Sequence, residues 1–259
     1  MHRMSQPVSI LMPVRNEASI IAEVVEEWHR DVFAHLPEES ELLFDDGAST
    51  DGTLEILEKL GQTHRYIRVI CSKRDGFAAA ARRLYAAARC PLIFFTDSDG
   101  QYIPAEFWNL APFIDQFDIV HGAKVGRQDA FFRCVASNCF NAISRWQFAT
   151  RINDVNSAFR LMKRSVVSEM LPQLHCMPSL LNAELLLRAA AAGYAVKQID
   201  VPHRPRKHGF SRGLPLSSFL SECMKAYRGL RQLKHELSAS RAAPQQTRGT
   251  LLADVKNER

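Results

Sequence analysis

Residues 92–101 read LIFFTDSDGQ, a short apolar run that is followed by an acidic turn. The run Leu92–Thr96 follows a proline and has the length and composition of a buried β-strand. Asp97 and Asp99 then stand at the carboxyl end of that strand, where open α/β sheets bind their ligands. Two carboxylates on either side of one small residue can both approach a single hard cation. The same letters also fit a plain turn, because Asp and Gly favour turns, but the position after a buried strand favours a metal site.

Similar apolar runs alternate with stretches of helical period throughout the first half of the chain. Strands separated by helices pair in parallel through right-handed crossovers, so we expect an α/β fold. The architecture would be a three-layer α/β/α sandwich around a mostly parallel, Rossmann-like sheet. The expected strands are Val8–Met12, Glu41–Phe44, Ile67–Cys71, Leu92–Thr96 and Asp118–His121, and the expected helices are Ala18–Ala34, Thr53–Leu60, Phe77–Arg89 and Ala105–Ile114.

The second half of the chain is less regular. Its pattern predicts helices over Phe131–Thr150 and Leu180–Ala192 and strands over Ala158–Met162 and Val196–Val201. Leucine and aromatic residues then fall on one arc of an amphipathic helix over residues 216–233. We therefore expect one catalytic domain over residues 1–215, an amphipathic helix over 216–235 and an irregular tail over 236–259.

Composition narrows the class of protein. The chain has 259 residues, 46% of them hydrophobic, which excludes a wholly disordered protein and a collagen. Its 33 basic and 28 acidic side chains give a net charge of +5, which suits an anionic ligand or membrane surface but is too small to indicate nucleic acid. Six cysteines without a C-x-x-C pair predict reduced thiols. No run approaches about 18 apolar residues and no signal peptide is recognisable, so we expect a cytoplasmic protein without a membrane-spanning helix.

Two further loops are expected at the same edge of the sheet as Asp97 and Asp99. Residues 45–53 read DDGASTDGT after the second strand, and residues 12–17 read MPVRNE after the first. A carboxylate in the former could accept hydrogen bonds from a nucleobase or ribose, whereas Ser49 or Thr50 with Asp51 could equally cap the next helix. Three loops that meet at one edge predict a ligand-binding crevice.

In this order, the motifs resemble those of glycosyltransferase family 2, whose catalytic domain has the GT-A fold; the resemblance covers about residues 8–212. The P-x-x-N-E motif stands as Pro13, Asn16 and Glu17, and D-x-D-x-Q as Asp97, Asp99 and Gln101. The family's D-D-G-S-x-D-x-T segment can be aligned in two ways. In one, it matches Asp46 through Thr53 without a gap, and Gly47 and Ala48 replace the second Asp and the Gly. In the other, Asp45-Asp46-Gly47 matches D-D-G and one inserted residue follows. We favour Asp46 as the aspartate that meets the base. The resemblance implies a nucleotide-sugar site at Pro13, Arg15, Glu17, Asp46, Asp97 and Gln101, and Mg²⁺ or Mn²⁺ held by Asp97, Asp99 and Gln101.

Within the family, the second half resembles the dolichyl- or polyprenyl-phosphate sugar synthases. Residues 154–160 are similar to their D-x-x-x-G-F-R element with Ala158 at the Gly position, and residues 182–189 match their acceptor-side helix. Residues 206–212 match R-x-x-G-x-S-K with Arg212 in place of Lys, which keeps the charge but changes its geometry. The implied roles are acceptor-phosphate binding for Lys124, Arg133 and Ser137, and catalysis for Asp99, Asp154, Glu184, Arg206 and Arg212.

The sequence and the resemblance together predict a metal-dependent, inverting glycosyltransferase with a UDP- or GDP-linked donor and a polyprenyl phosphate acceptor. A phosphate acceptor is already anionic and needs no base, whereas a saccharide hydroxyl, the alternative acceptor, would need Asp154 or Glu184 as general base. A sugar nucleotidyltransferase would want a glycine-rich basic loop after the first strand, which residues 13–17 lack. A non-catalytic nucleotide-sugar-binding module is a further alternative, suggested by Gly47, Ala48 and Ala158.

Contact with a membrane is a separate question. The helix over residues 216–233 carries the cations Lys225, Arg228 and Arg231, followed by Lys234, beside its apolar arc. Such a helix can lie in a bilayer interface as part of a peripheral protein at the cytoplasmic face, or it can dock onto the catalytic domain. The sequence leaves both arrangements open.

Overall fold

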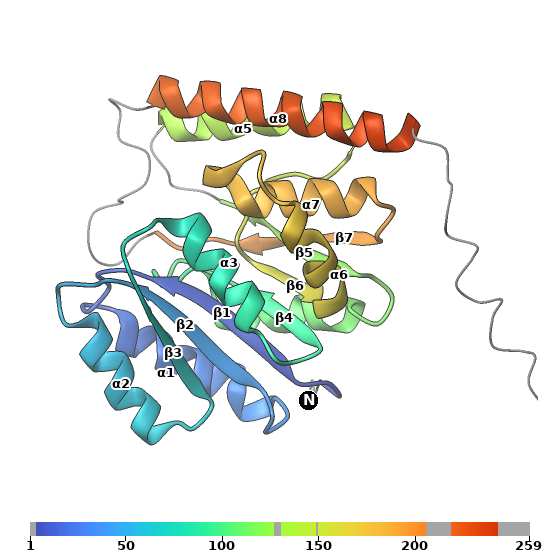
Figure 1. The fold of residues 1–259 in the computed structure, drawn as a ribbon. Coiled ribbons are helices and arrows are strands. Elements are labelled where there is room, and N and C mark those ends of the chain that lie inside the picture. Colours follow the sequence, from blue (N-terminus) through green and yellow to red (C-terminus); the bar gives the residue numbers. More distant parts are fainter. Residues whose placement is uncertain (1–3, 127–130, 149, 206–218, 243–259) are drawn as a thin grey trace, which may run out of the picture.

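A computed structural model describes residues 4–126, 131–148, 150–205 and 219–242. Its centre is a seven-stranded sheet in the order β3-β2-β1-β4-β6-β5-β7 (Figure 1). The predicted α/β fold with a mostly parallel sheet is confirmed. The strands are β1 (Val8–Val14), β2 (Glu41–Gly47), β3 (Ile67–Ser72), β4 (Leu92–Phe95), β5 (Ile119–Val125), β6 (Arg160–Lys163) and β7 (Val196–Pro202).

The direction of β6 is the feature that the sequence pattern did not predict. β1 pairs in parallel with β2 and β4, and β5 pairs in parallel with β7. β6 lies between β4 and β5 and is antiparallel to both. The residues just before β6 therefore lie at the same edge of the sheet as the carboxyl ends of β4 and β5.

Helices cover both faces of the sheet (Figure 1). α1 and α2 lie on one face and α3, α6 and α7 on the other, which gives the three predicted layers. α5 and α8 lie side by side over α7 and form an additional outer layer. The helices are α1 (Ile21–Asp31), α2 (Thr53–Thr63), α3 (Phe77–Ala87), α4 (Phe107–Leu110), α5 (Phe131–Phe148), α6 (Arg164–Met170), α7 (Leu181–Ala191) and α8 (Phe219–Ala242).

Two of the expected helices differ from the structure. The segment 105–114 forms only the short α4 between two 3₁₀ turns, and Pro112 interrupts a continuous helix because it lacks the N–H group that would bond to the preceding turn. α8 continues to Ala242, so residues 236–242 do not belong to an irregular tail. Leu230 and Leu233 of α8 are fully buried, and this packing on the domain accounts for the order of the helix.

The core explains why the central strands are apolar along their whole length. Phe94 and Phe95 of β4 are fully buried because helices cover both faces of the sheet. The ring of Phe94 packs against Trp28 on one side, 5.5 Å between centroids, and edge-on against Phe159, 4.7 Å away. Burial of each such side chain stabilises the fold by about 1.5–3 kcal/mol, so the strand that precedes Asp97 is rigidly held.

Within the described residues, no helix has both the length and the apolar character to cross a bilayer. The cysteines, all of which lie in the described segments, form no disulfide bond.

Candidate active site

The loops after β1 and β2 are joined to each other by hydrogen bonds. Asn16 N–H donates to Ser49 Oγ at 2.8 Å, and Thr50 N–H donates to Asn16 Oδ1 at 2.8 Å. Glu17 N–H donates to Thr53 Oγ1 at 2.9 Å. Two of the three predicted loops therefore form one unit at the carboxyl edge of the sheet.

Asp51 belongs to this unit as a structural residue. Its carboxylate accepts hydrogen bonds from the N–H of Ala18 at 3.1 Å and from the N–H and hydroxyl of Thr53. Partial burial would raise the pKa of Asp51, but these donors outweigh burial and lower it. Asp51 thus stabilises the start of α2, which is the helix-capping alternative considered for residues 49–51.

The conformation of Ala48 bears on how the acidic segment aligns with the family motif. Ala48 has φ +54°, in the left-handed region that favours glycine. This conformation favours the alignment without an insertion, in which Ala48 replaces the Gly of D-D-G-S and Asp46 is the first aspartate. The carboxylate of Asp46 accepts the N–H of Ser49 at 3.0 Å and also its hydroxyl, which fixes the turn.

Asp45, the other aspartate considered, faces away from the loops into a buried ion pair. Its carboxylate is 2.6 Å from Nε of Arg83 and accepts the hydroxyl of Ser72, also at 2.6 Å. Because Asp45 is fully buried and occupied in this way, Asp46 is the better candidate for a nucleobase contact.

The loop that carries Asp97 and Asp99 is attached to the loop after β1. The buried hydroxyl of Ser98 donates to the carbonyl of Pro13 at 2.9 Å, so the carboxylates flank a fixed point. Asp99 Oδ1 accepts the N–H of Gln101 at 3.1 Å. Gly100 has φ +71°, and a Cβ there would lie 2.9 Å from Cδ1 of Ile20, so the turn requires glycine.

This loop has the oxygen donors that Mg²⁺ and Mn²⁺ prefer. Asp97 and Asp99 are half-buried at the carboxyl edge of the sheet and offer carboxylate oxygens. Gln101 uses its side-chain nitrogen to donate to the carbonyl of Arg204 at 3.0 Å, so its amide oxygen is the atom that can bind a cation. The donor set fits a hard divalent ion.

The chain after β7 is anchored beside this loop. Arg204 N–H donates to the carbonyl of Gln101 at 2.8 Å, and the Arg204 guanidinium lies 3.1 Å from the carboxylate of Glu27 on α1. Residues 206–212, which match the family's R-x-x-G-x-S-K motif, follow Arg204 in the chain. Arg206 and Arg212 themselves lie outside the described residues.

Tyr102 connects the donor side with the predicted acceptor side. Its hydroxyl is buried 2.9 Å from Ser157 Oγ, and Nζ of Lys124 lies 5.9 Å from the centre of its ring. Burial raises the pKa of Tyr102 to about 12; Lys124 opposes this rise, whereas Asp97 and Asp154 add to it. Tyr102 thus links the loop that carries Asp97 and Asp99 to Ser157 and Lys124.

Lys124 and Asp154 form a pair at the end of β5. Asp154 Oδ2 accepts the backbone N–H of Lys124 at 3.2 Å and lies 3.8 Å from its ammonium nitrogen. Asn141 of α5 accepts the N–H of Val155 at 3.1 Å and donates to Ser137 Oγ at 3.5 Å, which brings Ser137 toward the same turn. The side chain of Arg133 is not among those described.

The fully buried side chains of Arg160 and His121 support the turn at Asp154, which has φ +47°. Arg160 donates to the carbonyls of Asn182 at 2.7 Å, Val155 at 3.1 Å and also Ser157. Nε2 of His121 lies 3.1 Å from the carbonyls of both Asn153 and Asp154. Sequence reasoning quoted Arg160 only as a motif residue and missed His121, for which the sequence offers no local signal.

The family model described as glycosyl transferase family 2 matches residues 9–171, which is more than half of the chain. The chain belongs to this family. The match includes the loops after β1, β2 and β4 and the turn at Asp154, whereas Arg204 lies beyond it.

Two curated relatives are bacterial undecaprenyl-phosphate sugar transferases. Undecaprenyl-phosphate 4-deoxy-4-formamido-L-arabinose transferase of Edwardsiella ictaluri (strain 93-146) is 28% identical over 214 residues, which are 80% of this chain and 63% of the relative. The protein of the same name from Proteus mirabilis (strain HI4320) is 26% identical over 210 residues, 79% of this chain and 62% of the relative. The chain thus spans less than two thirds of the length of the curated relatives it matches.

Solved structures of glycosyltransferases share the architecture. Glucosyl-3-phosphoglycerate synthase from Mycobacterium tuberculosis, in complex with Mn²⁺, UDP-glucose and phosphoglyceric acid, has a TM-score of 0.65 at 18% identity and covers 89% of this chain and 80% of its own. A mannosyltransferase from Pyrobaculum calidifontis in complex with GDP-mannose and Mn²⁺ has a TM-score of 0.58 at 19% identity, with coverage of 95% and 77%. These likenesses confirm the GT-A fold that the sequence predicted.

Glu184 does not fit the general-base role that a saccharide acceptor would require of Asp154 or Glu184. It is buried, and its carboxylate accepts the N–H groups of His175, Cys176 and Met177 at 2.8–3.0 Å as well as Nε of Arg188 at 2.9 Å. Burial alone would raise the pKa of Glu184, but these donors lower it. A carboxylate held in this way stabilises the loop before α7 and is a poor proton acceptor, which corrects the prediction.

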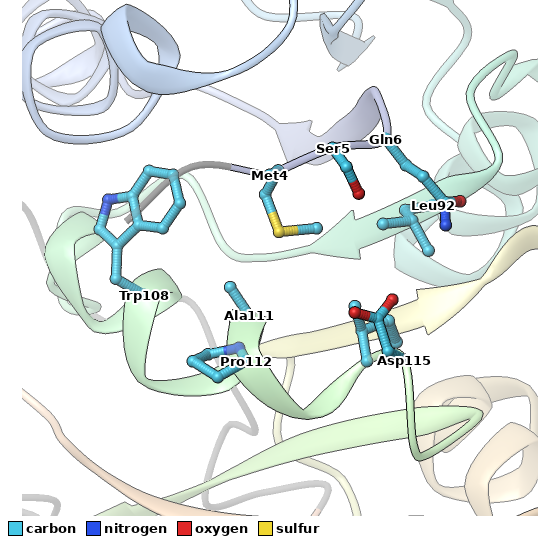
Figure 2. Close-up of a pocket in the computed structure, with 9 residues that line it drawn as sticks. Met4, Ser5, Gln6, Leu92, Trp108, Ala111, Pro112 and Asp115 are labelled. Atoms are coloured by element: carbon cyan, nitrogen blue, oxygen red, sulfur yellow. The ribbon is translucent and has the colours of Figure 1, made fainter. Parts of the chain in front are cut away.

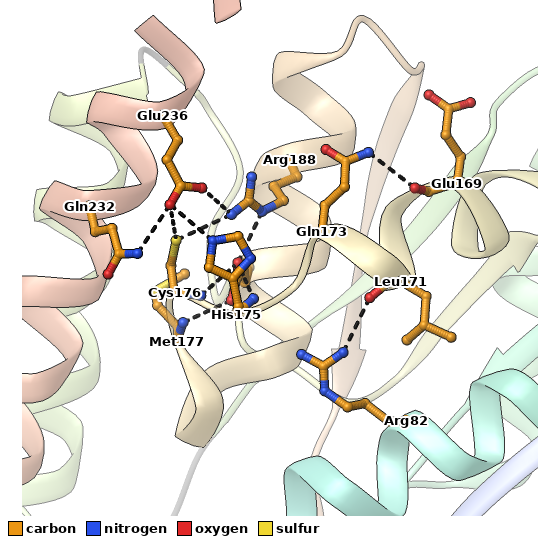
Figure 3. A network of polar contacts seen from close by, with 11 residues as sticks. Arg82, Glu169, Leu171, Gln173, His175, Cys176, Met177, Arg188, Gln232 and Glu236 are labelled. Carbon is orange, nitrogen blue, oxygen red and sulfur yellow. Dashed lines mark hydrogen bonds and ion pairs between the residues drawn. The ribbon is translucent and has the colours of Figure 1, made fainter. Parts of the chain in front are cut away.

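The same network holds α8 against α7 (Figure 3). Arg188 continues from Glu184 to Glu236 of α8, 2.7 Å away, and also contacts the sulfur of Cys176. His175, Cys176 and Glu236 bring one donor atom each to within 4.8 Å of one another. Because the Arg188 guanidinium already contacts two of these three side chains, we interpret the cluster as an ionic link between helices.

A pocket of about 200 Å³ lies at the opposite edge of the sheet (Figure 2). Leu92 at the start of β4, residues 4–6 before β1, and Trp108 of α4 line it. Ligands of parallel α/β sheets bind at the carboxyl ends of the strands, so we do not assign the family's sugar donor to this pocket.

Proposed function

We propose that this chain is an inverting glycosyltransferase that moves a sugar from a nucleoside diphosphate, UDP or GDP, to a polyprenyl phosphate. The observation that carries the proposal is the surroundings of Tyr102. Tyr102 directly follows the loop of Asp97, Asp99 and Gln101 in the chain, and its hydroxyl lies 2.9 Å from Ser157 Oγ while its ring centre lies 5.9 Å from Nζ of Lys124, which pairs with Asp154. Donor-binding and acceptor-binding groups are therefore close enough to serve one transfer.

On the donor side, Asp46 would accept hydrogen bonds from the base, and Pro13, Arg15 and Glu17 would line the site from the loop joined to it. Asp97, Asp99 and Gln101 would hold Mg²⁺ or Mn²⁺, which supplies charge stabilisation for the diphosphate when bound. Arg206 and Arg212 follow the anchored Arg204 in the chain, and their charges would neutralise the leaving group.

On the acceptor side, an oxygen of the polyprenyl phosphate attacks the anomeric carbon. The bond from that carbon to the diphosphate oxygen breaks, and the configuration inverts, as the family resemblance implies. The phosphate is anionic near neutral pH and needs cations rather than a base. Lys124, Arg133 and Ser137 would bind it, and Asp154 would orient Lys124 through its two contacts with that residue.

A polyprenyl acceptor also requires the protein to reach a bilayer. We propose that the chain acts as a peripheral protein at the cytoplasmic face of a membrane, where nucleotide sugars are available.

The test is transfer itself. Purified protein with undecaprenyl phosphate in detergent and a panel of radiolabelled UDP- and GDP-sugars, with Mn²⁺ or Mg²⁺, should give a product that is extracted into organic solvent and cleaved by mild acid. Asp99→Ala should abolish the product and leave the melting temperature nearly unchanged, because Asp99 is half-buried in a loop that the buried hydroxyl of Ser98 also anchors. Label only in water-soluble saccharide would refute the lipid acceptor, and a fully active variant would refute the cation site.

A further inference from the structure

The outer face of the layer formed by α5 and α8 carries an apolar stripe. Val135, Cys139, Ala142 and Trp146 are all exposed on α5 and follow one another at spacings of four, three and four residues, so they lie on one side of the helix. Trp146 is 78% exposed, although tryptophan is usually well buried in a folded domain. The stripe therefore calls for an explanation beyond the packing of this chain.

The neighbouring face of α8 adds cations to the apolar stripe. Arg228, Arg231 and Lys234 are exposed on α8, and Met224 and Tyr227 are exposed among them. Nζ of Lys234 lies 5.4 Å from the centre of the Trp146 ring, which places the positive face directly beside the stripe.

Negative charge is directed away from this surface. The sequence of α5 contains no Asp or Glu, and that of α8 contains only Glu222 and Glu236. Glu222 binds Ser179 and Lys225, and Glu236 binds Arg188 beneath the helix. An exposed tryptophan among cations, on two helices whose glutamates bind other side chains, has the chemistry of the interface of an anionic bilayer.

The position of the surface in the fold agrees with such a role. α5 starts six residues after Val125, the last residue of β5, and Lys124 precedes Val125. Asn141 and Ser137, on the inner side of α5, connect to the turn at Asp154. One side of α5 thus faces the predicted acceptor site while its other side is exposed.

A groove at the far end of the stripe has matching chemistry. It has a volume of about 500 Å³ between the ends of α5, α7 and α8. Arg151 and Lys234 contribute its positive charge, and Leu187 and Leu237 contribute apolar surface. This combination accommodates an anionic head group with the start of its acyl chain.

We propose that the exposed face of α5 and α8 docks onto an anionic lipid bilayer, with Trp146 inserted at the level of the head groups. The proposal rests on the proposed function, because it names the surface through which a lipid-linked acceptor is reached. α8 can then contact the bilayer and the catalytic domain at the same time, because its exposed side faces the bilayer and its buried side packs on the domain.

Vesicles that contain neither sugar nor polyprenyl phosphate test docking separately from transfer. Fluorescence of the full-length protein is measured with vesicles of phosphatidylglycerol and phosphatidylcholine, with and without brominated acyl chains. We expect quenching by the brominated chains, and partitioning at least tenfold weaker for Trp146→Ser. The double variant Arg228→Glu/Arg231→Glu should bind at least 25-fold more weakly, from about fivefold for each cation lost.

Lys59→Glu/Arg65→Glu is the matched control, because it changes the net charge equally at exposed positions of α2 and the turn after it, on the other face of the sheet. It should bind vesicles as the parent does. Trp146→Ser should retain transfer to undecaprenyl phosphate dissolved in detergent, which separates loss of docking from loss of catalysis.

Three results would overturn the proposal. They are equal binding to vesicles of phosphatidylcholine alone, no quenching of Trp146, or a dimer in solution that Trp146→Ser converts to monomers without any effect of vesicles. The last result would assign the face to a contact between copies of the chain. Absence of glycosyl transfer with normal vesicle binding would refute the proposed function and leave the docking surface intact.

Discussion

His121 should make the stability of this protein depend on pH in a specific window. The side chain is fully buried beneath the turn at Asp154. Burial lowers the pKa of His121 from 6.5 to about 3, and the neighbouring charge of Arg160 contributes in the same direction. Between these two values the unfolded chain binds a proton at this position and the folded protein does not. Acidification through this window therefore favours unfolding.

The size of the effect follows from the same two pKa values. Each pH unit inside the window changes the free energy of unfolding by about 1.4 kcal/mol for one proton. From pH 6.5 to 4.5, His121 alone should lower the free energy of unfolding by about 2 kcal/mol. His121→Gln has no titrating group but retains a donor that can face the carbonyls of Asn153 and Asp154.

Urea unfolding at pH 6.5, 5.5 and 4.5 measures this difference. The parent should lose about 2 kcal/mol more than His121→Gln over the interval, because all other titrating groups are common to both proteins. His235→Gln, on the exposed side of α8, serves as the control and should follow the parent. Parallel curves for the parent and His121→Gln would refute the conclusion that burial keeps this imidazole neutral.

Further predictions concern backbone conformation, the acceptor site and the attachment of α8. Ala48→Gly should raise the free energy of unfolding in urea by about 1 kcal/mol, because Ala48 has a left-handed conformation. Gly100→Ala should lower this free energy by at least the same amount, because Gly100 is also left-handed and a Cβ there would meet Ile20. A loss of stability in Ala48→Gly would contradict the turn described. Asp154→Asn should reduce kcat with a phosphate acceptor less than about 100-fold in steady-state assays, whereas a larger loss would indicate a general base. Glu236→Gln should speed amide hydrogen exchange in α8 and lower the free energy of unfolding by about 1–2 kcal/mol, because Arg188 loses a charged partner. Unchanged exchange would show that apolar packing alone holds α8 on the domain.

The parts of the fold that sequence reasoning predicted are those set by local patterns. The apolar run before Asp97 and the turn residues after it are adjacent in the chain, so strand, loop and candidate cation site could be predicted together. The same holds for the loops after β1 and β2, whose positions at one edge follow from parallel strand direction. Their direct hydrogen bonds, such as that between Asn16 and Ser49, confirm the convergence that was inferred.

What sequence reasoning missed depends on partners distant in the chain. Glu184 has the sequence context of an acceptor-side carboxylate, but its four donors come from residues 175–177 and Arg188, and no periodicity reveals that they converge. The end of α8 was likewise placed too early, because the ion pair of Glu236 with Arg188 spans 48 positions. No sequence pattern indicated that β6 is antiparallel, because the residue pattern of a four-residue strand does not reveal its direction.

Under the proposed function, the reversed direction of β6 separates the acceptor-binding segment from the donor-binding loops along the chain. Because β6 runs antiparallel to its neighbours, the chain reaches the carboxyl edge of β4 and β5 just before β6, and residues 150–157 form a separate segment there that contacts the loop after β4 through Ser157 and Tyr102. Substitutions or insertions in that segment would change which acceptor binds, while the residues proposed to bind the nucleotide stay the same. Diversification of acceptors around a constant donor would follow naturally from such a partition.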